Sequence, residues 1–382
     1  MAETVRVPVA KADGQVSRNM MLTHMQPQQE QKDEREQQLQ HWVNQVLVSL
    51  NNGSLTDPVV PIRAVSGDAS FRRYFRVYYR GKVYIAVDAP PEHEDSKAFV
   101  KVGQLLATAG VRVPLVYAAD FEQGFMLLED FGDRLLFNAL REMQQVSDIE
   151  GVDRLYIAAI DVLVNFQSKA DKQALGPYDR QQLNMEMAFF EEWFCNALLG
   201  MELKAPEHFL ITEALVFLED AALAQPTVVV HRDYHSRNII LPDGGVEPGI
   251  IDFQDAVSGP YTYDLVSLLR DCYISWPEPR IVNWLRYYLT QAKQQDLVLD
   301  ITQQQLVRNF DLMGLQRHLK VMGIFSRLHL RDNRSGYLAD IPLVIHYFLE
   351  ISGRYPELKP FREWFQRSVL PLAINRLPSR QS

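Results

Sequence analysis

The spacing of hydrophobic residues changes several times along the 382-residue chain. The first regular stretch repeats at helical intervals, with apolar positions at Leu39, Trp42, Val43, Val46, Leu47 and Leu50. Asn51, Asn52 and Gly53 tolerate the left-handed conformation that ends many helices, so we expect this helix to stop there. Residues 1–36 include a stretch rich in Gln and Glu with few core-forming residues, which indicates a flexible N-terminal extension.

From Val59 onward, apolar and polar residues alternate, as is typical of half-buried strands. The expected elements are antiparallel strands over residues 61–65, 73–79 and 83–87, a helix over 96–109, and extended segments over 113–118 and 125–128. The polar run from Glu129 to Asp133 then breaks the pattern and marks a linker. Residues 37–130 are therefore predicted to form a small, β-rich, nucleotide-binding N-terminal lobe.

Apolar residues beyond this linker recur mostly at helical spacing. The expected helices cover residues 134–145, 151–169, 179–199, 208–224, 264–274, 279–295 and 303–330. Two short apolar runs, Val228–Val230 and Gly249–Ile251, interrupt them and indicate buried strands. Residues 131–382 are thus predicted to form a larger, mostly helical C-terminal lobe. The overall prediction is an α+β fold of two lobes, with ligands expected in the cleft between them.

Composition narrows the range of partners. The hydrophobic content of 47% is that of a well-filled globular protein, and no apolar run is long enough to span a membrane. The net charge is −9, whereas binding to a nucleic-acid backbone requires an excess of Lys and Arg. The cysteines, Cys195 and Cys272, provide no disulfide framework and fit a reducing cytoplasm. We therefore expect a cytoplasmic monomer with no nucleic-acid or membrane partner.

A polar motif lies between the two short strands of the C-terminal lobe. It reads His231-Arg232-Asp233-Tyr234-His235-Ser236-Arg237-Asn238 and is followed by Ile251-Asp252-Phe253. Asp233 has the chemistry of a base that accepts a hydroxyl proton, and Asn238 and Asp252 are oxygen ligands of the kind that Mg²⁺ prefers. Together these residues favour transfer of a phosphoryl group to a hydroxyl group.

Each of these side chains has a structural alternative. A single Asp or Asn in a loop often caps backbone amides. The HxDxxxxN pattern with a strand on either side, and an acidic residue ending the second strand, favours the phosphotransfer site instead. His235 either reaches the transferring phosphate or packs within the loop. Asp264, near an expected helix start, is interpreted as a brace for these loops, because a carboxylate there satisfies free backbone N–H groups.

The N-terminal lobe offers candidates for binding phosphate. The small polar loop that contains Ser66, Gly67 and Ser70 allows backbone amides and hydroxyls to approach phosphate oxygens, although a plain β-turn is the alternative. Kinases usually hold these phosphates with a Lys on the third strand, but residues 84–88 contain none. Arg72 and Arg73 are the nearest substitutes, and a solvated hairpin face is the alternative for them. We assign Arg73 to the nucleotide.

The motif of the C-terminal lobe resembles that of the aminoglycoside phosphotransferase and choline kinase superfamily, whose fold is that of the protein kinases. The run Asp252-Phe253-Gln254-Asp255-Ala256, continuing through Gly259-Pro260 and Tyr263–Asp271, is similar within it to the anomeric kinases of N-acetylmuramate and N-acetylglucosamine that serve peptidoglycan recycling. The segments Gly67–Arg76 and Asp88–Glu92 fit the same group. The resemblance covers the chain from about residue 40 to the C-terminus.

This resemblance implies a kinase that uses ATP and Mg²⁺ to phosphorylate the anomeric hydroxyl of these amino sugars, giving the α-1-phosphate. It also implies that the linker residues Glu129, Asp130 and Phe131 offer backbone groups to adenine. Two alternatives stay open. One is a kinase of another small alcohol, such as an aminoglycoside or choline, and the other is a non-catalytic binding protein with a kinase fold.

The acceptor side is less defined by the sequence. Aromatic residues downstream of Asp252 either line it or belong to the core, namely Tyr261, Tyr263 and Trp276. Four basic residues share one face of an expected helix: Arg317, Lys320, Arg327 and Arg331. They form a solvated basic face, or one of them contacts the lactyl carboxylate of N-acetylmuramate.

Overall fold

The computed structural model describes residues 34–50, 59–65, 71–242 and 247–378. Residues 1–33 of the predicted extension lie outside this part, as do Ser66, Gly67 and Ser70. The chain divides into two compact units. The first runs to Lys97 and resumes over Leu115–Asp130, and the second comprises Ala98–Pro114 and everything from Phe131 onward. The division at residue 130 lies within the predicted linker, whereas residues 98–114, which we had placed in the N-terminal lobe, belong to the second unit.

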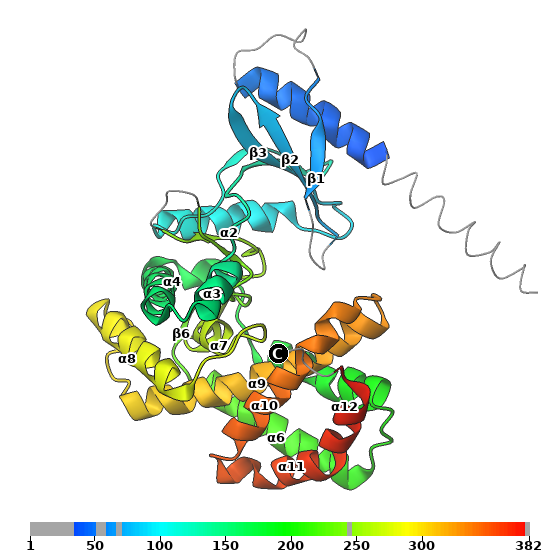
Figure 1. The fold of residues 1–382 in the computed structure, drawn as a ribbon, viewed down its shortest axis with the longest axis vertical. Helices are drawn as coiled ribbons and strands as arrows, with labels where there is room; N and C mark the ends of the chain where they lie inside the picture. Colours follow the sequence, from blue (N-terminus) through cyan, green and yellow to red (C-terminus); the bar gives the residue numbers. More distant parts are fainter. Residues whose placement is uncertain (1–33, 51–58, 66–70, 243–246, 379–382) are drawn as a thin grey trace, which may run out of the picture. The chain divides into compact units, whose positions relative to one another are not determined.

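The first unit is a helix packed on an antiparallel sheet (Figure 1). The strands are β1 (Ile62–Val65), β2 (Arg73–Tyr79), β3 (Lys82–Asp88), β4 (Val116–Asp120) and β5 (Phe125–Glu129), in the order β1-β2-β3-β5-β4. The helix spans residues 34–50 and therefore begins before residue 37, where we had expected the extension to end. Its buried residues Leu39, Val43 and Leu47 share a hydrophobic core with Phe75 and Val77 of β2.

The second unit is mostly helical. Its helices are α2 (Ser96–Thr108), α3 (Leu136–Gln145), α4 (Ile149–Lys169), α5 (Arg180–Phe189), α6 (Ala205–Leu223), α7 (Tyr263–Leu269), α8 (Glu278–Gln294), α9 (Gln303–Leu330), α10 (Ile341–Ser352), α11 (Lys359–Trp364) and α12 (Leu370–Arg376). The 3-10 helices are η1 (Lys172–Ala174), η3 (Ser335–Ala339) and η4 (Pro356–Leu358), and the π-helices are η2 (Phe190–Leu198), which continues α5, and η5 (Phe365–Val369). Helix α9 packs against α5, α6, α7 and α10, so it runs through the interior of this unit (Figure 1).

The second unit also contains two short antiparallel pairs. The pair β7 (Ile239–Ile240) and β8 (Gly249–Ile250) lies in the chain between the strands of the other pair, β6 (Thr227–Val230) and β9 (Val257–Pro260). The predicted buried strands are thus confirmed, and the whole has the α+β composition expected from the sequence. One expected helix, over residues 264–274, is wrong in length, because α7 ends at Leu269. The chain leaves the helix there, and the carboxylate of Asp271 then binds backbone N–H groups of Ser236 and Tyr273.

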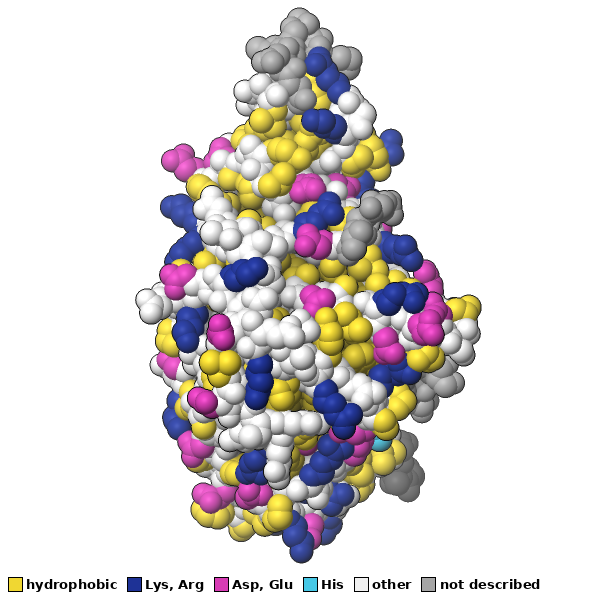
Figure 2. Space-filling model, turned by 90° about the vertical axis from the view of Figure 1, so that its left-hand side faces the viewer, with side chains coloured by type: hydrophobic (Ala, Val, Ile, Leu, Met, Phe, Trp, Pro, Cys, Tyr) yellow, Lys and Arg dark blue, Asp and Glu magenta, His cyan; other side chains and the backbone are white. Residues whose placement is uncertain are grey.

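The described surface carries charges of both signs. On the face shown in Figure 2, Lys and Arg side chains are interspersed with Asp and Glu side chains rather than gathered in one continuous basic area. Among the helices of the described residues, none is both long and apolar enough to cross a membrane.

The packing of α9 requires a glycine at position 323, and this requirement can be tested. A Cβ atom at Gly323 would lie 2.3 Å from the backbone carbonyl carbon of Phe189, and backbone cannot move aside cheaply. We expect Gly323→Ala to lower the free energy of unfolding by about 1–3 kcal/mol, measured from urea denaturation. The matched control is Gly336→Ala, where a Cβ meets nothing within 4 Å. Equal stability of the two variants would contradict this packing.

Candidate active site

The predicted catalytic loop shows an alternating pattern of burial. Tyr234 and Ser236 are completely buried, whereas the residues that alternate with them, Asp233, His235 and Arg237, are half-buried. The hydroxyl of Tyr234 donates to the carbonyl of Ala159 in α4 at 2.8 Å. Ser236 donates from both its backbone N and its hydroxyl to Asp271, at 3.0 and 2.5 Å. Alternate residues thus anchor the loop in the helical core and leave the others accessible to a ligand.

The loop begins with a strained residue that three other segments hold. Arg232 has a left-handed backbone conformation, with φ of 77°, which costs a non-glycine residue roughly 1–3 kcal/mol. Asp264 at the start of α7 accepts the backbone N–H groups of His231 and Arg232, at 2.6 and 3.0 Å. Arg317 of α9 donates to the carbonyl of Arg232 at 2.9 Å, and Glu186 of α5 pairs with its guanidinium group. The interpretation of Asp264 as a brace is therefore confirmed.

The brace is electrostatically unusual. Asp264 is fully buried, and this burial raises the pKa of its carboxyl group to about 6, although the nearby His231 and Arg317 and the two backbone N–H groups act in the opposite direction. Its bonds to the loop are worth more when the carboxylate is ionised, because charge-assisted hydrogen bonds are stronger than neutral ones. The site is thus suited to neutral pH.

Basic side chains of α9 lie next to the catalytic loop. Arg317 and Lys320 are each only 7% exposed, so the solvated-face interpretation is wrong for these two. Lys320 pairs with Glu186 at 3.0 Å and donates to the hydroxyl of Tyr263 at 2.9 Å. Burial opposes ionisation of Asp233, but the charges of Lys320, His235, Arg317 and Arg232 outweigh it and lower the pKa of Asp233. Asp233 is therefore held in its ionised form.

The two predicted metal ligands lie together beside Asp233. The amide nitrogen of Asn238 is 3.3 Å from a carboxylate oxygen of Asp252 and 3.1 Å from the backbone carbonyl oxygen of Asp233. Asp252 also has a left-handed backbone conformation, with φ of 64°, and accepts a bond from Gln254 at 3.0 Å. One amide oxygen and one carboxylate fit Mg²⁺, which takes few protein ligands and completes its shell with water and phosphate oxygens. Among the described residues there is no group of three or more His, Cys, Asp and Glu side chains suited to a metal.

His235 packs against an aromatic ring. Its imidazole meets the ring of Tyr273 edge to face, with centroids 5.3 Å apart. Its backbone N donates to the carbonyl of Asp233 at 2.9 Å, so the residue also shapes the loop. Tyr261, Tyr263 and Trp276, which we considered for the acceptor side, are all buried and belong to the core.

The first unit replaces the expected strand Lys with a different arrangement. Asp88 ends β3, is fully buried, and lies opposite Arg73 in the register of β2 and β3. Its two carboxylate oxygens bind two guanidinium groups, that of Arg73 at 2.7 Å and that of Arg35 at 2.5 Å. Nearby, the buried Arg72 pairs with Glu94 at 3.1 Å. The strand thus carries a carboxylate that positions arginines. Arg73 also pairs with Glu36 at 3.7 Å, so the three arginines of this cluster face three carboxylates.

The linker residues are held within their own units. The backbone N of Glu129 donates to the carbonyl of Leu115, and the carboxylate of Glu129 accepts from the backbone N of Leu115. Asp130 forms an ion pair with Arg76 at 2.5 Å. Phe131 is buried against Gly249, where an added Cβ atom would lie 2.5 Å from its ring. Their side chains therefore fix the linker, and the contact of its backbone groups with adenine stays a prediction.

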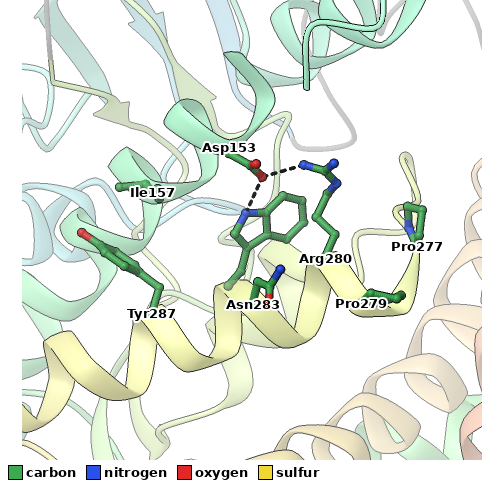
Figure 3. Close-up of a pocket in the computed structure, with 8 residues that line it drawn as sticks. Asp153, Ile157, Pro277, Pro279, Arg280, Asn283 and Tyr287 are labelled. Atoms are coloured by element: carbon green, nitrogen blue, oxygen red, sulfur yellow. Dashed lines mark hydrogen bonds and ion pairs between the residues drawn. The ribbon is translucent and has the colours of Figure 1, made fainter. Parts of the chain in front are cut away.

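A separate pocket lies between α4 and α8 (Figure 3). It has a volume of about 480 Å³, and Asp153 in its wall accepts bonds from Arg280 and Trp284, at 2.7 and 3.0 Å. None of the predicted site residues lines it. Two residues of the catalytic region were given no role from the sequence. Glu186 lies far from the motif in the chain, and Arg237 lies within the motif but its spacing indicates no function.

A model of the phosphotransferase enzyme family matches residues 61–298, which span both units and include all the motifs described above. This chain belongs to the phosphotransferase enzyme family. Relatives in the family include the N-acetylmuramate/N-acetylglucosamine kinase of Pseudomonas putida, which is 40% identical over 87% of this chain and 96% of that protein. A protein of the same name from Neisseria meningitidis is 38% identical over 77% of this chain and 86% of the relative.

Solved structures extend the likeness of this phosphotransferase to the fold. An ethanolamine kinase of Plasmodium vivax has a TM-score of 0.56 and 12% identity, covering 80% of this chain and 88% of its own. The choline kinase LicA of Streptococcus pneumoniae has a TM-score of 0.53 and 12% identity, covering 81% and 98%. At these identities the likeness concerns the fold alone, and it confirms the kinase-like fold that we predicted.

The cations around Asp233 generate a prediction about pH. Replacement of Lys320 by Met removes the positive charge that acts most strongly on Asp233, so its pKa should rise. Because a base must be deprotonated to work, the acidic limb of the profile of kcat/KM against pH should move to higher pH. The control is Arg331→Met, since Arg331 follows α9 but is exposed and pairs with Asp332. An unmoved acidic limb in Lys320→Met would show that Lys320 does not tune Asp233.

Proposed function

We propose that this phosphotransferase is an ATP-dependent kinase that phosphorylates the anomeric hydroxyl of N-acetylmuramate and N-acetylglucosamine, giving the α-1-phosphate. The observation that carries the chemistry is the ionised Asp233 on the accessible side of a braced loop, beside the oxygen ligands of Asn238 and Asp252. The sugar rests on relatives of that name, which are 38–40% identical over most of this chain.

In this proposal the loop supplies orientation and a proton acceptor. Asp233 accepts a hydrogen bond from the anomeric hydroxyl and takes its proton as the oxygen attacks the γ-phosphorus. A hemiacetal hydroxyl is more acidic than an ordinary alcohol, so a base with a lowered pKa is sufficient. Little covalent help is needed in phosphoryl transfer, and positioning matters most. His235 either touches the transferring group or shapes the loop through Tyr273.

Asn238 and Asp252 would hold Mg²⁺, which neutralises phosphate charge when bound. In the first unit, Asp88 would keep the guanidinium groups of Arg73 and Arg35 in place as cations that take the role of the usual third-strand Lys. The backbone of Glu129–Phe131 is proposed as the edge that recognises adenine, and Ser66, Gly67 and Ser70 as the phosphate loop.

The charge around Asp233 argues against a cationic acceptor. Arg232, Arg237, Arg317 and Lys320 all belong to the catalytic loop or to the helix beside it. An aminoglycoside or choline would require acidic groups or an aromatic cage at this place. A neutral or anionic sugar fits better. We propose that the kinase acts in peptidoglycan recycling in the cytoplasm. A purely non-catalytic protein would have no use for an ionised base beside two metal ligands.

The decisive experiment is a panel of acceptors. We expect the protein with Mg·ATP to phosphorylate N-acetylmuramate and N-acetylglucosamine, and ³¹P NMR to place the new phosphate on the anomeric oxygen. Kanamycin, choline and glycerol should remain unmodified. Phosphorylation of one of these instead, or ATP turnover with none, would overturn the proposed acceptor.

Asp233 provides the test of the chemistry. We expect Asp233→Ala to lower kcat by about 10²- to 10⁴-fold, because the hydroxyl loses its orienting base. The binding of Mg·ATP should stay close to that of the wild type, measured by isothermal titration calorimetry. Near-normal turnover would remove Asp233 from the mechanism.

The metal ligands make a separate prediction. Asp252→Asn keeps the size of the side chain but removes its negative charge, so the concentration of Mg²⁺ needed for half-maximal activity should rise by at least about tenfold. The control is Asp255→Asn, since Asp255 is exposed and near Asp252 in the chain. If both variants need the same Mg²⁺ concentration as the wild type, Asp252 is not a ligand.

A further inference from the structure

The cations of the catalytic region differ in how they are neutralised. Arg232 pairs with Glu186, and Lys320 pairs with the same carboxylate at 3.0 Å. Arg317 gives a hydrogen bond to the carbonyl of Arg232. The side chains of Arg232, Lys320 and Arg317 therefore have structural roles. In the part of the chain that the structure describes, no carboxylate lies within ion-pair distance of the fourth cation, Arg237.

Arg237 is held by aromatic rings instead. Its guanidinium carbon lies 3.5 Å from the ring centroid of Tyr273 and 5.0 Å from that of Phe137 in α3. A planar guanidinium group on a ring face keeps the N–H groups at its edge available for a planar, bidentate acceptor. Packing on rings also restricts the side chain before a ligand arrives, which reduces the entropy lost on binding. Within the residues that the structure describes, Arg237 is therefore a preorganised cation without a carboxylate partner.

Its place in the loop suggests which anion it meets. Asp233, His235 and Arg237 are the three half-buried residues of the alternating pattern, whereas the metal ligand Asn238 is buried. Both His235 and Arg237 contact the ring of Tyr273. Arg237 thus lies four residues after the base that receives the acceptor hydroxyl, and it shares a supporting ring with His235.

We propose that Arg237 binds the carboxylate of an anionic acceptor, which for the proposed sugars is the lactyl carboxylate of N-acetylmuramate. This inference rests on the proposed function. The two sugars differ by that lactyl group, since N-acetylglucosamine carries a hydroxyl in its place. Arg237 is then a specificity-determining residue that favours N-acetylmuramate. It replaces Arg317 and Lys320, which the sequence had suggested for this role and which are buried among structural partners.

The two sugars and one pair of variants test this inference. In Arg237→Met, kcat/KM for N-acetylmuramate should fall by about tenfold to a hundredfold, as expected for a lost charged hydrogen-bond partner, while kcat/KM for N-acetylglucosamine stays within about threefold. The matched control is Arg141→Met, because Arg141 also lies over the ring of Phe137, at 5.9 Å, but is exposed on α3. It should leave both sugars unaffected.

A third substrate removes the remaining ambiguity. The carboxamide of N-acetylmuramate keeps the size of the lactyl group without its charge, so the wild type and Arg237→Met should phosphorylate it at rates within about threefold of each other. An equal loss for all three substrates would assign Arg237 to the phosphate or to loop structure, and no loss would leave it without a role. Both results overturn the inference while the proposed function stands. A wild-type protein that phosphorylates none of the sugars would overturn the proposed function itself.

Discussion

The bond between a buried carboxylate and two consecutive backbone N–H groups is the constraint on which the active site depends. Asp264 holds His231 and Arg232 at the end of β6, and together with Arg317 and Glu186 it supports the left-handed conformation of Arg232. The loop after it then runs in the one direction that places Asp233 beside Asn238 and Asp252. A residue that touches no substrate thus determines where the base is.

The same region shows how a protein keeps several charges out of water. Glu186 is shared by Arg232, Lys320 and the hydroxyl of Tyr178, so one carboxylate neutralises a group drawn from α5, α9 and the loop. Burial alone would raise the pKa of this acid, but the surrounding Lys320 and Arg232 lower it. Such a network is stable only when all its members are present, because removing one leaves a buried charge uncompensated.

Local pattern and motif spacing were enough to predict much of this architecture. The limits of α9 agree with the periodicity of residues 303–330, and the Asp233, Asn238 and Asp252 constellation follows from spacing. Burial was harder to predict. Arg317 and Lys320 resemble a solvated face because their partners lie in distant segments. The premature end of α7 depends on bonds that Asp271 makes to the catalytic loop, and helix periodicity contains no information about them.

The alternating burial of the catalytic loop separates positions that the core constrains from positions that can change during evolution. Tyr234 and Ser236 are fixed by the core, so most replacements there would damage the fold before any new substrate could be selected. At position 237, by contrast, the contacts of the side chain among the described residues are with the rings of Phe137 and Tyr273. Related enzymes with this fold can therefore acquire different acceptors through changes at position 237, while the base Asp233, four residues earlier, remains intact.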